Sequence, residues 1–215
     1  VTAYKKQGRG GTGSNSTSLL EDDYVSQLFI GSTHDHILFI TNAGKAYWVK
    51  VHEIPEASKA SRGTHIKSMI AIGADEEITT VVTLKEFSDE QYLFMTTMNG
   101  VVKKVKTSEF SNAKTRGIIG LKLNAGDKLI SAIPTDGNSE VLLVSRRGKA
   151  LRFTEEDVRS MGRASCGIKG LKLAEGDEVA GAIKVIPDES ILLLTEKGYG
   201  KRVHFEDFKP HGRGT

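Results

Sequence analysis

One short pattern recurs four times along the chain and constrains its fold more than any other feature. Each copy is a run of apolar and β-branched residues, a turn with glycine, and a second, more polar run. The copies are ILFITNAGKAYWVKV (37–51), LFMTTMNGVVKKVKT (93–107), VLLVSRRGKALRFTE (141–155) and ILLLTEKGYGKRVHF (191–205). The turn glycines are Gly44, Gly100, Gly148 and Gly198, at intervals of 56, 48 and 50 residues. The pattern predicts four β-hairpins, with the first strand fully buried and the second exposed on one side.

A second module follows each hairpin and consists of an Arg-Gly loop, an acidic turn and an apolar strand. The loop copies are SRGTHIKSM (61–69), TRGIIGLKL (115–123), CGIKGLKL (166–173) and the shortened HGRGT (211–215). The strand copies are GDKLISAI (126–133), GDEVAGAI (176–183) and DDYVSQLFI (22–30). The strand near the start places KKQGRGGTGS (5–14) where later repeats carry their loop. We therefore interpret this opening stretch as the first copy of a repeated loop, rather than as a linker.

A period near 50 residues with about four strands per unit is typical of a propeller-like fold. A β-sandwich would not require similar sequence in each unit, and the only helical pattern is one turn near 154–161. We predict an all-β domain over residues 1–215, built of radially repeated four-stranded blades. We expect this piece to fold with half-blades at both ends only if residues 1–33 complete the blade begun at 190–215. The repeats lie near 1–35, 36–84, 91–135, 140–185 and 190–215.

Several classes of protein are disfavoured by composition. The single cysteine, Cys166, excludes a disulfide framework and is typical of a reducing cytosol. No apolar run approaches a membrane span, and no signal peptide precedes the domain. His34 and His36 flank a carboxylate but lack further ligands at a matching spacing, so no metal site is expected. No nucleophile and base recur at a catalytic spacing, so we expect no catalytic residue in this chain.

The net charge of +3 is modest, but the charges are segregated along the sequence. Windows drawn around the hairpins and Arg-Gly loops hold 27 of the 30 Lys and Arg residues and no acid. In a propeller, equivalent positions of successive blades lie around one ring. The segregation therefore predicts a basic belt, with acids on another part of the surface. Such a belt supplies phosphate contacts in series along a curved path.

The candidate DNA-binding residues follow from this belt. In the opening loop, glycines let the backbone approach a phosphate, Arg9 holds it, and Gln7 is available to hydrogen-bond. Lys122, Lys169 and Lys172 stay outside the set because the following strand could direct them to the rim. The set comprises Lys5, Lys6, Gln7, Arg9, Gly10, Gly11, Lys45, Arg62, Lys103, Lys104, Arg116, Arg146, Arg147, Lys149, Arg152, Arg163, Lys197, Lys201, Arg202 and Arg213.

The stretches TAYKKQGRGGTG (2–13), 28–66 and VRSMGRASCGIKGLKLAEGD (158–177) together resemble the C-terminal domain of DNA gyrase A, from the type IIA topoisomerase family. The resemblance covers essentially the whole chain. It implies a β-pinwheel, in which neighbouring blades exchange strands, and duplex DNA wrapped around the basic perimeter. In that family the chiral wrap supports negative supercoiling, driven by ATP hydrolysis on gyrase B.

The sequence departs from the family in two respects. The family's glycine box carries basic residues where this chain has Gly8 and Thr12, and Lys5 and Lys6 lie just upstream. We also count about four blades, fewer than the family's usual ring, so we expect either a fragment of such a ring or a form that lacks blades. The related C-terminal domain of topoisomerase IV, which recognises DNA crossings, stays an alternative. So does a propeller that binds another protein.

The resemblance also implies the surroundings of the domain. It implies no cofactor for the domain itself, with ATP and Mg²⁺ serving the whole enzyme. The partners are double-stranded DNA, the rest of gyrase A, and gyrase B in an A2B2 assembly, in the cytoplasm of a bacterium with its nucleoid. The DNA-cleaving tyrosine of the family belongs to a preceding domain outside this chain.

Overall fold

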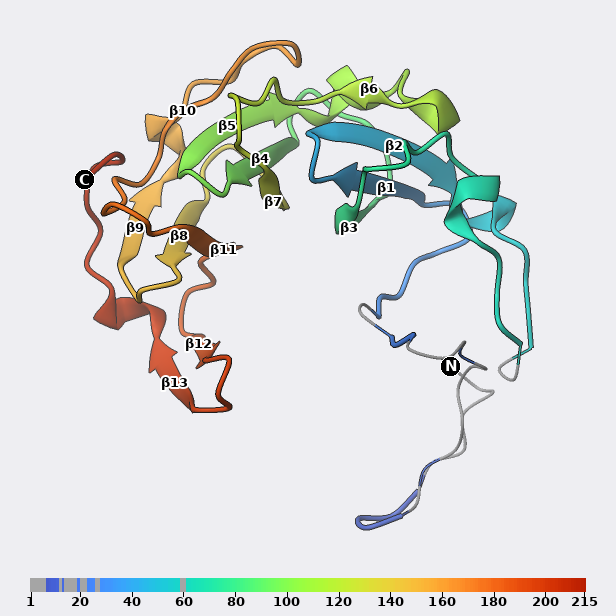
Figure 1. The fold of residues 1–215 in the computed structure, drawn as a ribbon, viewed down its shortest axis with the longest axis horizontal. Helices are drawn as coiled ribbons and strands as arrows, with labels where there is room; N and C mark the ends of the chain where they lie inside the picture. Colours follow the sequence, from blue (N-terminus) through green and yellow to red (C-terminus); the bar gives the residue numbers. More distant parts are fainter. Residues whose placement is uncertain (1–6, 12, 14–18, 20–22, 26–27, 59–60) are drawn as a thin grey trace.

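The computed structural model describes residues 7–11, 13, 19, 23–25, 28–58 and 61–215. Their regular structure consists of β-strands and short 3-10 turns, which confirms the all-β prediction (Figure 1). The four predicted hairpins are present, and their turn glycines have φ between 74° and 85°, where other residues are strained. The hairpins are β1 (His36–Thr41) with β2 (Lys45–Lys50), β4 (Tyr92–Thr97) with β5 (Val101–Lys106), β8 (Glu140–Ser145) with β9 (Ala150–Thr154), and β12 (Ser190–Leu194) with β13 (Gly200–His204).

Each hairpin is followed by one 3-10 turn, and three of these turns contact the preceding repeat. A single turn lies within the predicted range 154–161, so that prediction is confirmed. Two further 3-10 turns lie in the Arg-Gly loops, namely η2 (Ile66–Ser68) and η4 (Lys114–Arg116). The turns after the hairpins are η1 (Val51–Glu53), η3 (Thr107–Phe110), η5 (Glu155–Asp157) and η6 (Phe205–Asp207).

The strand after each acidic turn pairs with the first hairpin strand of its own repeat. These strands are β3 (Ile78–Leu84), β7 (Leu129–Thr135) and β11 (Val179–Lys184), which pair antiparallel with β1, β4 and β8. They lie on the concave side of the arc that the sheets form in Figure 1. They are therefore the innermost strands of their sheets.

The outermost strands are exchanged between repeats. β6 (Ile118–Ile119) follows the second hairpin but pairs with β2 of the first, and β10 (Ile168–Lys169) follows the third hairpin but pairs with β5 of the second. A bridge from Arg152 to Pro210 starts the same arrangement beside β9. The resulting sheets have the orders β3-β1-β2-β6, β10-β5-β4-β7, β11-β8-β9 and β12-β13.

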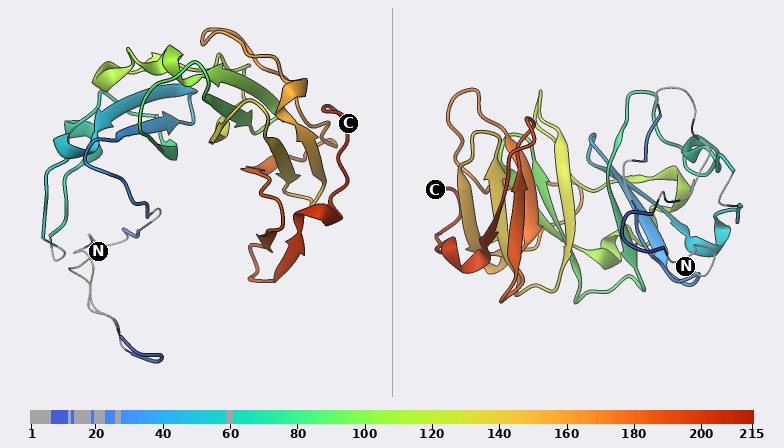
Figure 2. Two further views of the ribbon diagram at one scale, coloured as in Figure 1. Left: turned by 180° about the vertical axis from the view of Figure 1, so that it is seen from behind. Right: turned by 90° about the horizontal axis from the view of Figure 1, so that it is seen from below.

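The core lies between consecutive sheets, because alternate residues of a strand face opposite neighbours. In β4, Leu93 packs against the first sheet with Leu38, whereas Phe94 packs against the third sheet with Val141. A strand in this position is buried on both faces, which explains the almost continuous burial of β1, β4 and β8. The sheets follow one another along an open arc, seen from behind and from below in Figure 2.

The last hairpin departs from the predicted burial. Phe205 and Ile191 pack against Leu142 of the third sheet, but nothing in the described residues covers the opposite face. Leu192 and Leu194 are 62% and 69% exposed, so the prediction of a buried first strand is wrong here. It holds only where a following sheet packs on the hairpin.

The strand expected at 22–30 is also absent from the residues that the structure describes there. Residues 23–25 and 28–30 have no strand, and Leu28 and Ile30 are exposed. The described part of the first 33 residues therefore does not complete the blade of β12 and β13. Among the described residues, no helix has the length and apolar character needed to cross a bilayer.

Candidate nucleic-acid interface

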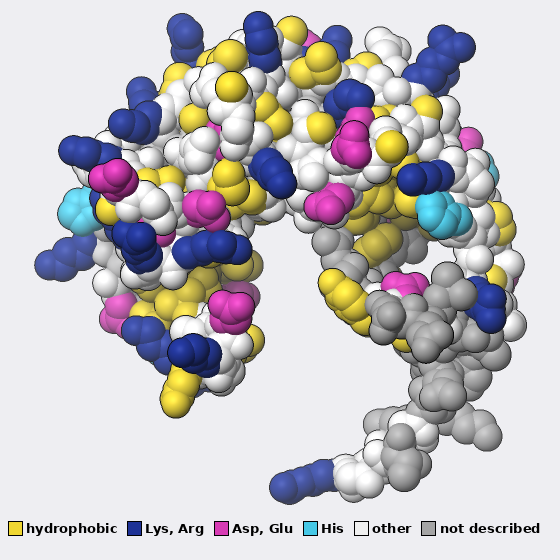
Figure 3. All heavy atoms as spheres, viewed as in Figure 1, with side chains coloured by type: hydrophobic (Ala, Val, Ile, Leu, Met, Phe, Trp, Pro, Cys, Tyr) yellow, Lys and Arg dark blue, Asp and Glu magenta, His cyan; other side chains and the backbone are white. Residues whose placement is uncertain are grey.

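The loops that supply the exchanged strands lie along the convex edge of the arc. Most side chains that project from this edge in Figure 3 are Lys or Arg. In the second repeat, η4 presents Lys114 and Arg116, both exposed, just before the exchanged strand β6. Neither makes an ion pair or a side-chain hydrogen bond to a described residue. Their charges are therefore available to an anion in solution.

The corresponding arginines of the next loops are partly engaged. The Nε of Arg163 lies 3.6 Å from a carboxylate oxygen of Glu109. Arg213 donates from Nε to the Asp157 carbonyl at 2.8 Å and from Nη1 to the Lys169 carbonyl at 3.2 Å. A guanidinium has five N–H donors, so the exposed Arg213 still has donors for a phosphate. These contacts fix each loop against the preceding repeat.

Cations at the hairpin turns lie beside acids, contrary to the expected separation. Lys45 pairs with Glu76, and Arg146 Nη1 lies 3.3 Å from Glu178 Oε2. The acidic turn precedes the innermost strand, which pairs with the first hairpin strand and so brings the acids to the hairpin turn. Five of the seven ion pairs among the described residues involve a cation predicted to bind DNA. The expectation that acids lie on another part of the surface is wrong at these turns.

Two neighbours in this region are held by backbone carbonyls instead. Arg147 donates from Nη1 to the Glu175 carbonyl at 3.0 Å. Lys149 donates from Nζ to the carbonyls of Lys172 and Thr215, at 2.9 and 3.2 Å. Both side chains are exposed, so they stay candidates despite these contacts.

Lys103 and Lys104 are corrections to the predicted set, because both are buried. Lys103 is fully buried, and its ammonium donates to the carbonyls of Gly120, Arg163 and Ser165. Burial lowers its pKa to about 8, because a charged amine loses hydration there. Lys104 is 7% exposed and donates from Nζ to the Glu155 carbonyl at 2.9 Å. Neither ammonium can reach a DNA phosphate in this fold.

Arg152 is a third correction, because it is directed into the junction with the next repeat. It pairs with Glu140 and donates from Nη1 to the Phe205 carbonyl at 2.9 Å. Aligning the hairpins at their turn glycines would have indicated all three cases. Lys103 aligns with Tyr47 and Leu151, and Lys104 and Arg152 align with Trp48, side chains that are typical of an interior.

The glycine loop near the start is closed by its own glutamine. Gly13 donates its N–H to Gln7 Oε1 at 2.9 Å, and Gln7 Nε2 donates to the Gly13 carbonyl at 3.3 Å. Gly10 has φ of 80°, and a Cβ at Gly11 would lie 2.5 Å from Gln7 Oε1. Gln7 therefore shapes the loop, and its exposed amide keeps a second N–H donor for DNA. The loop presents Arg9 to solvent.

The remaining predicted residues differ in what can be said of them. Lys5 and Lys6 lie outside the described residues. Sequence reasoning missed Lys114, although it lies in a counted basic window and two residues before Arg116. Exposed cations that make no ion pair or side-chain hydrogen bond to a described residue include Arg9, Arg62, Lys114, Arg116, Lys122, Arg159, Lys169, Lys172, Lys197, Lys201, Arg202 and Lys209.

Antiparallel sheets of up to four strands that follow an arc and exchange their outermost strands define an all-β repeat domain of the propeller and pinwheel class. The convex edge of this domain is basic (Figure 3). The chain belongs to the family described as the DNA gyrase C-terminal domain, beta-propeller, whose pattern matches residues 1–32, 35–85, 91–136, 139–186 and 189–215.

Relatives of known sequence agree with this family. The chain is 54% identical over 165 residues to the DNA gyrase A protein of Treponema pallidum (strain Nichols), an alignment that covers 77% of this chain and 20% of the relative. It is 41% identical over 167 residues to the DNA gyrase A protein of Klebsiella oxytoca, which covers 78% and 19%. The chain thus spans about a fifth of the length of the curated relatives that it matches.

Solved structures agree as well. A structure of the DNA gyrase A C-terminal domain matches with a TM-score of 0.81 and 32% identity, over 99% of this chain and 69% of that one. The C-terminal domain of DNA topoisomerase IV matches with a TM-score of 0.77 and 32% identity, over 84% and 57%. The predicted β-pinwheel and the resemblance to gyrase are confirmed.

Proposed function

We propose that this domain binds double-stranded DNA along its convex edge, without sequence specificity, and bends it into a chiral wrap. The observation that carries the proposal is the repetition of exposed cations on successive exchanged loops. The second-repeat loop carries Lys114 and Arg116, the third carries Lys169 and Lys172, and the last carries Arg213. Because these loops follow the arc, a duplex that contacts all of them must curve with it.

The energetics require several such contacts at once. Each phosphate that a cation neutralises releases counterions and contributes about −0.9 to the slope of log affinity against log salt. Bending a duplex of 20–30 base pairs by 40–90° costs on the order of 1–6 kcal/mol. No single lysine offsets that cost, whereas a series of loops along a curved edge does. Contacts of this kind read the backbone and carry no base sequence.

The same proposal places the domain in a larger enzyme. As part of gyrase A, it would present wrapped DNA to a catalytic core that is shared with gyrase B in an A2B2 assembly. ATP and Mg²⁺ would act on that core, and the DNA-cleaving tyrosine would lie in a preceding domain. The domain itself would do no chemistry. The cytoplasm of a bacterium, with its nucleoid, would be its location.

The experiment that tests this proposal is a plasmid topology measurement. The domain is incubated with relaxed closed circular plasmid, a type I topoisomerase is added, and the protein is removed before the linking number is read. We expect a linking-number change that grows with protein and disappears as salt is raised. Tight binding without a change would favour the topoisomerase IV alternative, in which crossings are recognised without a strong wrap. Absence of binding at low salt would favour a protein partner.

Matched charge reversals sharpen this experiment. Arg116→Glu reverses a cation on an exchanged loop, whereas Lys128→Glu reverses an exposed cation beside an acidic turn. We expect the first variant to reduce the linking-number change at least severalfold and the second to leave it near the parent value. Equal effects would contradict the assignment of the convex edge.

A further inference from the structure

One position on the second hairpin strand faces the next repeat in every junction between sheets. Trp48 on β2, Lys104 on β5 and Arg152 on β9 occupy this position, opposite Leu38, Phe94 and Leu142 respectively. The three side chains are chemically unlike one another. They nevertheless share a nitrogen that carries a hydrogen at the end of a long side chain.

In each junction, that nitrogen donates to the 3-10 turn that follows the next hairpin. Trp48 Nε1 donates to the carbonyls of Phe110 and Ser111 at 3.1 and 3.2 Å. Lys104 Nζ donates to the carbonyl of Glu155, the first residue of η5, at 2.9 Å. The Phe110 and Glu155 carbonyls also accept the N–H groups of Ala113 and Val158 at 2.9 and 3.0 Å, so the donor from the neighbouring repeat uses the second lone pair of each oxygen. Arg152 repeats the arrangement, with Nη1 2.9 Å from the Phe205 carbonyl of η6.

The backbone at the same position makes a second link in two of the junctions. The carbonyl of Lys104 accepts the N–H of Met161 at 2.9 Å, and the carbonyl of Arg152 accepts the N–H of His211 at 2.8 Å. Met161 and His211 begin the loops that carry Arg163 and Arg213. One residue therefore holds both the 3-10 turn and the start of the arginine loop of the next repeat.

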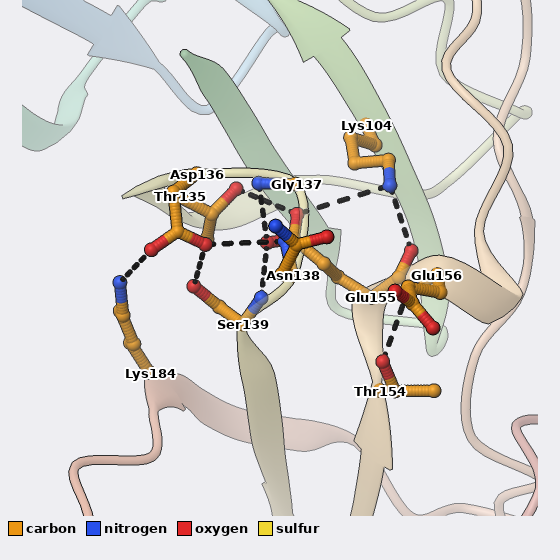
Figure 4. Close-up of polar contacts among 10 residues, drawn as sticks. All are labelled: Lys104, Thr135, Asp136, Gly137, Asn138, Ser139, Thr154, Glu155, Glu156 and Lys184. Atoms are coloured by element: carbon orange, nitrogen blue, oxygen red, sulfur yellow. Dashed lines mark hydrogen bonds and ion pairs between the residues drawn. The ribbon is translucent and has the colours of Figure 1, made fainter. Parts of the chain in front are cut away.

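The buried charge at the second junction is compensated in detail (Figure 4). Lys104 Nζ lies 4.0 Å from Glu155 Oε2, and that carboxylate is fully buried. The carboxylate also accepts hydrogen bonds from the Thr135 hydroxyl and from the N–H groups of Gly137 and Ser139, at 2.7 to 2.9 Å. A network in which every member is satisfied resists rearrangement, because each broken contact leaves a buried polar group unpaired.

Arg202 occupies the same position on β13, opposite Leu192, but has no neighbour to hold among the described residues. It is exposed and makes no side-chain hydrogen bond to a described residue. Arg152 and Arg202 are thus the same residue type at the same position, one engaged with a following repeat and the other not. Arg202 is therefore a matched control for Arg152 within the same chain.

We infer that Trp48, Lys104 and Arg152 are interblade latches that set the angle between consecutive sheets and thereby the curvature imposed on DNA. The part of this inference that concerns DNA rests on the proposed function. The latches do not contact DNA, since they are directed into the junctions. They act by placing each exchanged loop relative to the one before it.

The first test needs no DNA. Spin labels are attached to the exposed hairpin turns through Ala43→Cys and Glu196→Cys in a Cys166→Ala background, and their separation is measured by double electron–electron resonance. We expect Arg152→Met to shift and broaden the distance distribution, whereas Arg202→Met leaves it unchanged. A distribution that Arg152→Met does not alter would overturn the latch, whatever the domain does with DNA.

A second variant covers the case in which Arg152→Met does not fold, which circular dichroism would report. Trp48→Phe keeps an aromatic ring but removes the N–H that the Phe110 and Ser111 carbonyls accept, together with part of the indole ring. It is measured with the same labels, and we expect a shift across the first junction. An unchanged distribution in this folded variant would likewise overturn the inference.

The second test uses DNA and separates curvature from affinity. At saturating protein, we expect Arg152→Met to reduce the linking-number change per bound domain at least twofold, with its affinity for a short linear duplex retained. Arg202→Met removes the same charge and should lower affinity while keeping the change at saturation. Equal losses of affinity and linking-number change in Arg152→Met would make it a DNA contact and overturn the inference. If the parent domain gives no change, the proposed function fails, and the distance measurement alone decides the latch.

Discussion

At Lys103 an ammonium group is surrounded by three backbone carbonyl oxygens and shielded from solvent. Two of those carbonyls belong to Arg163 and Ser165, in the loop of the next repeat. The side chain therefore acts as an internal strut between repeats and not as a surface charge. The pKa of this ammonium group therefore differs between the folded and the unfolded chain, and the pH dependence of stability measures the difference.

The pKa of Lys103 predicts a rise in stability with pH. Its folded pKa is about 8 and its ordinary value is 10.5, so between these values the unfolded chain binds the proton that the folded chain has lost. The free energy of unfolding then increases as pH rises from 8. We expect the parent to gain on the order of 1–2 kcal/mol over Lys103→Met between pH 8 and pH 10. Urea denaturation at several pH values measures the difference.

Tyr47 limits the pH window of this measurement. Burial and the hydrogen bond with Glu76 raise its pKa to about 12, so the stability that its neutral form contributes is lost as pH rises from about 10 to 12. Both proteins carry Tyr47, and the comparison removes its effect. Curves for the parent and for Lys103→Met that stay parallel from pH 8 to 10 would contradict the internal strut.

Arg116 and Lys45 offer a second prediction at this scale, because one is unpaired with any described residue and the other is paired with Glu76. We expect Arg116→Gln to lower the slope of log affinity against log salt by about 0.9, as the loss of one phosphate contact requires. Lys45→Gln should lower it by clearly less. Fluorescence anisotropy of a labelled duplex across a salt series gives both slopes. A larger effect at Lys45 would reverse our ranking of the cations.

The sequence identified the basic regions of the site but not which of their cations are available. Strand alternation and the exchange of strands decide which side chains point into a junction, and neither depends on the residue's own charge. Lys103 and Lys104 look like surface residues when read alone, and their burial follows from sheets packed on both sides. The pairing of Lys45 with Glu76 needs a contact across 31 residues, which local patterns do not contain.

At the scale of elements, the exchanged strand β6 depends on close backbone approach. Gly117 precedes it with φ of 72°, and a Cβ there would overlap the Tyr47 ring. The strand is only two residues long, so its place beside β2 relies on this packing. A side chain at Gly117 would push β6 away from β2, the strand with which it pairs.

Gly117→Ala is therefore expected to destabilise the domain by more than its backbone conformation alone requires. Gly117 has φ of 72° and ψ of 158°, a combination essentially confined to glycine that costs another residue about 1–3 kcal/mol, and overpacking adds about 1–3 kcal/mol. Gly126→Ala is the control for a positive φ without a close neighbour, with φ of 76° and nothing within 4 Å of its Cβ. Urea denaturation gives both free energies of unfolding. Equal losses in the two variants would show that the Tyr47 contact is unimportant.

Much of the element order could be predicted, and the reasons are local. Turn glycines at regular spacing and alternating apolar residues specify hairpins within about 15 residues of sequence. The exchange of β6 and β10 was implied only by the resemblance to gyrase, because each strand has two residues and no alternation to detect. The strand expected at 22–30 is absent from the described residues. An apolar pattern forms a strand only where the edge strand of a sheet is available to hydrogen-bond with it.

The whole molecule has a well-packed centre and a loosely covered C-terminal end. The second sheet has neighbours on both sides, while β12 and β13 form a two-stranded sheet with one exposed face. A cleft of about 1370 Å³ is lined by residues of both this hairpin and the third sheet, such as Leu193, Val144 and Ile183. Local stability should therefore fall toward the last hairpin.

Hydrogen exchange tests this gradient directly. We expect amides of β12 and β13 to exchange at least tenfold faster than those of β4 and β5, because opening the last hairpin exposes little additional apolar surface. Bound DNA should slow exchange in the arginine loops more than in β4. Uniform protection across all four hairpins would show that the arc unfolds as one cooperative unit.

The exchange of strands between repeats also limits how such a chain can lengthen or shorten. A blade contains residues from two repeats, so a cut at the edge of a blade divides two sheets. Deleting the segment from the start of one hairpin to the start of the next removes one hairpin, one exchanged strand and one inner strand. The repeats on either side can then pair with each other, and their sheets keep their full sets of strands. In a gene that encodes this domain, duplication or deletion is tolerated in units of the sequence repeat and not of the visible blade.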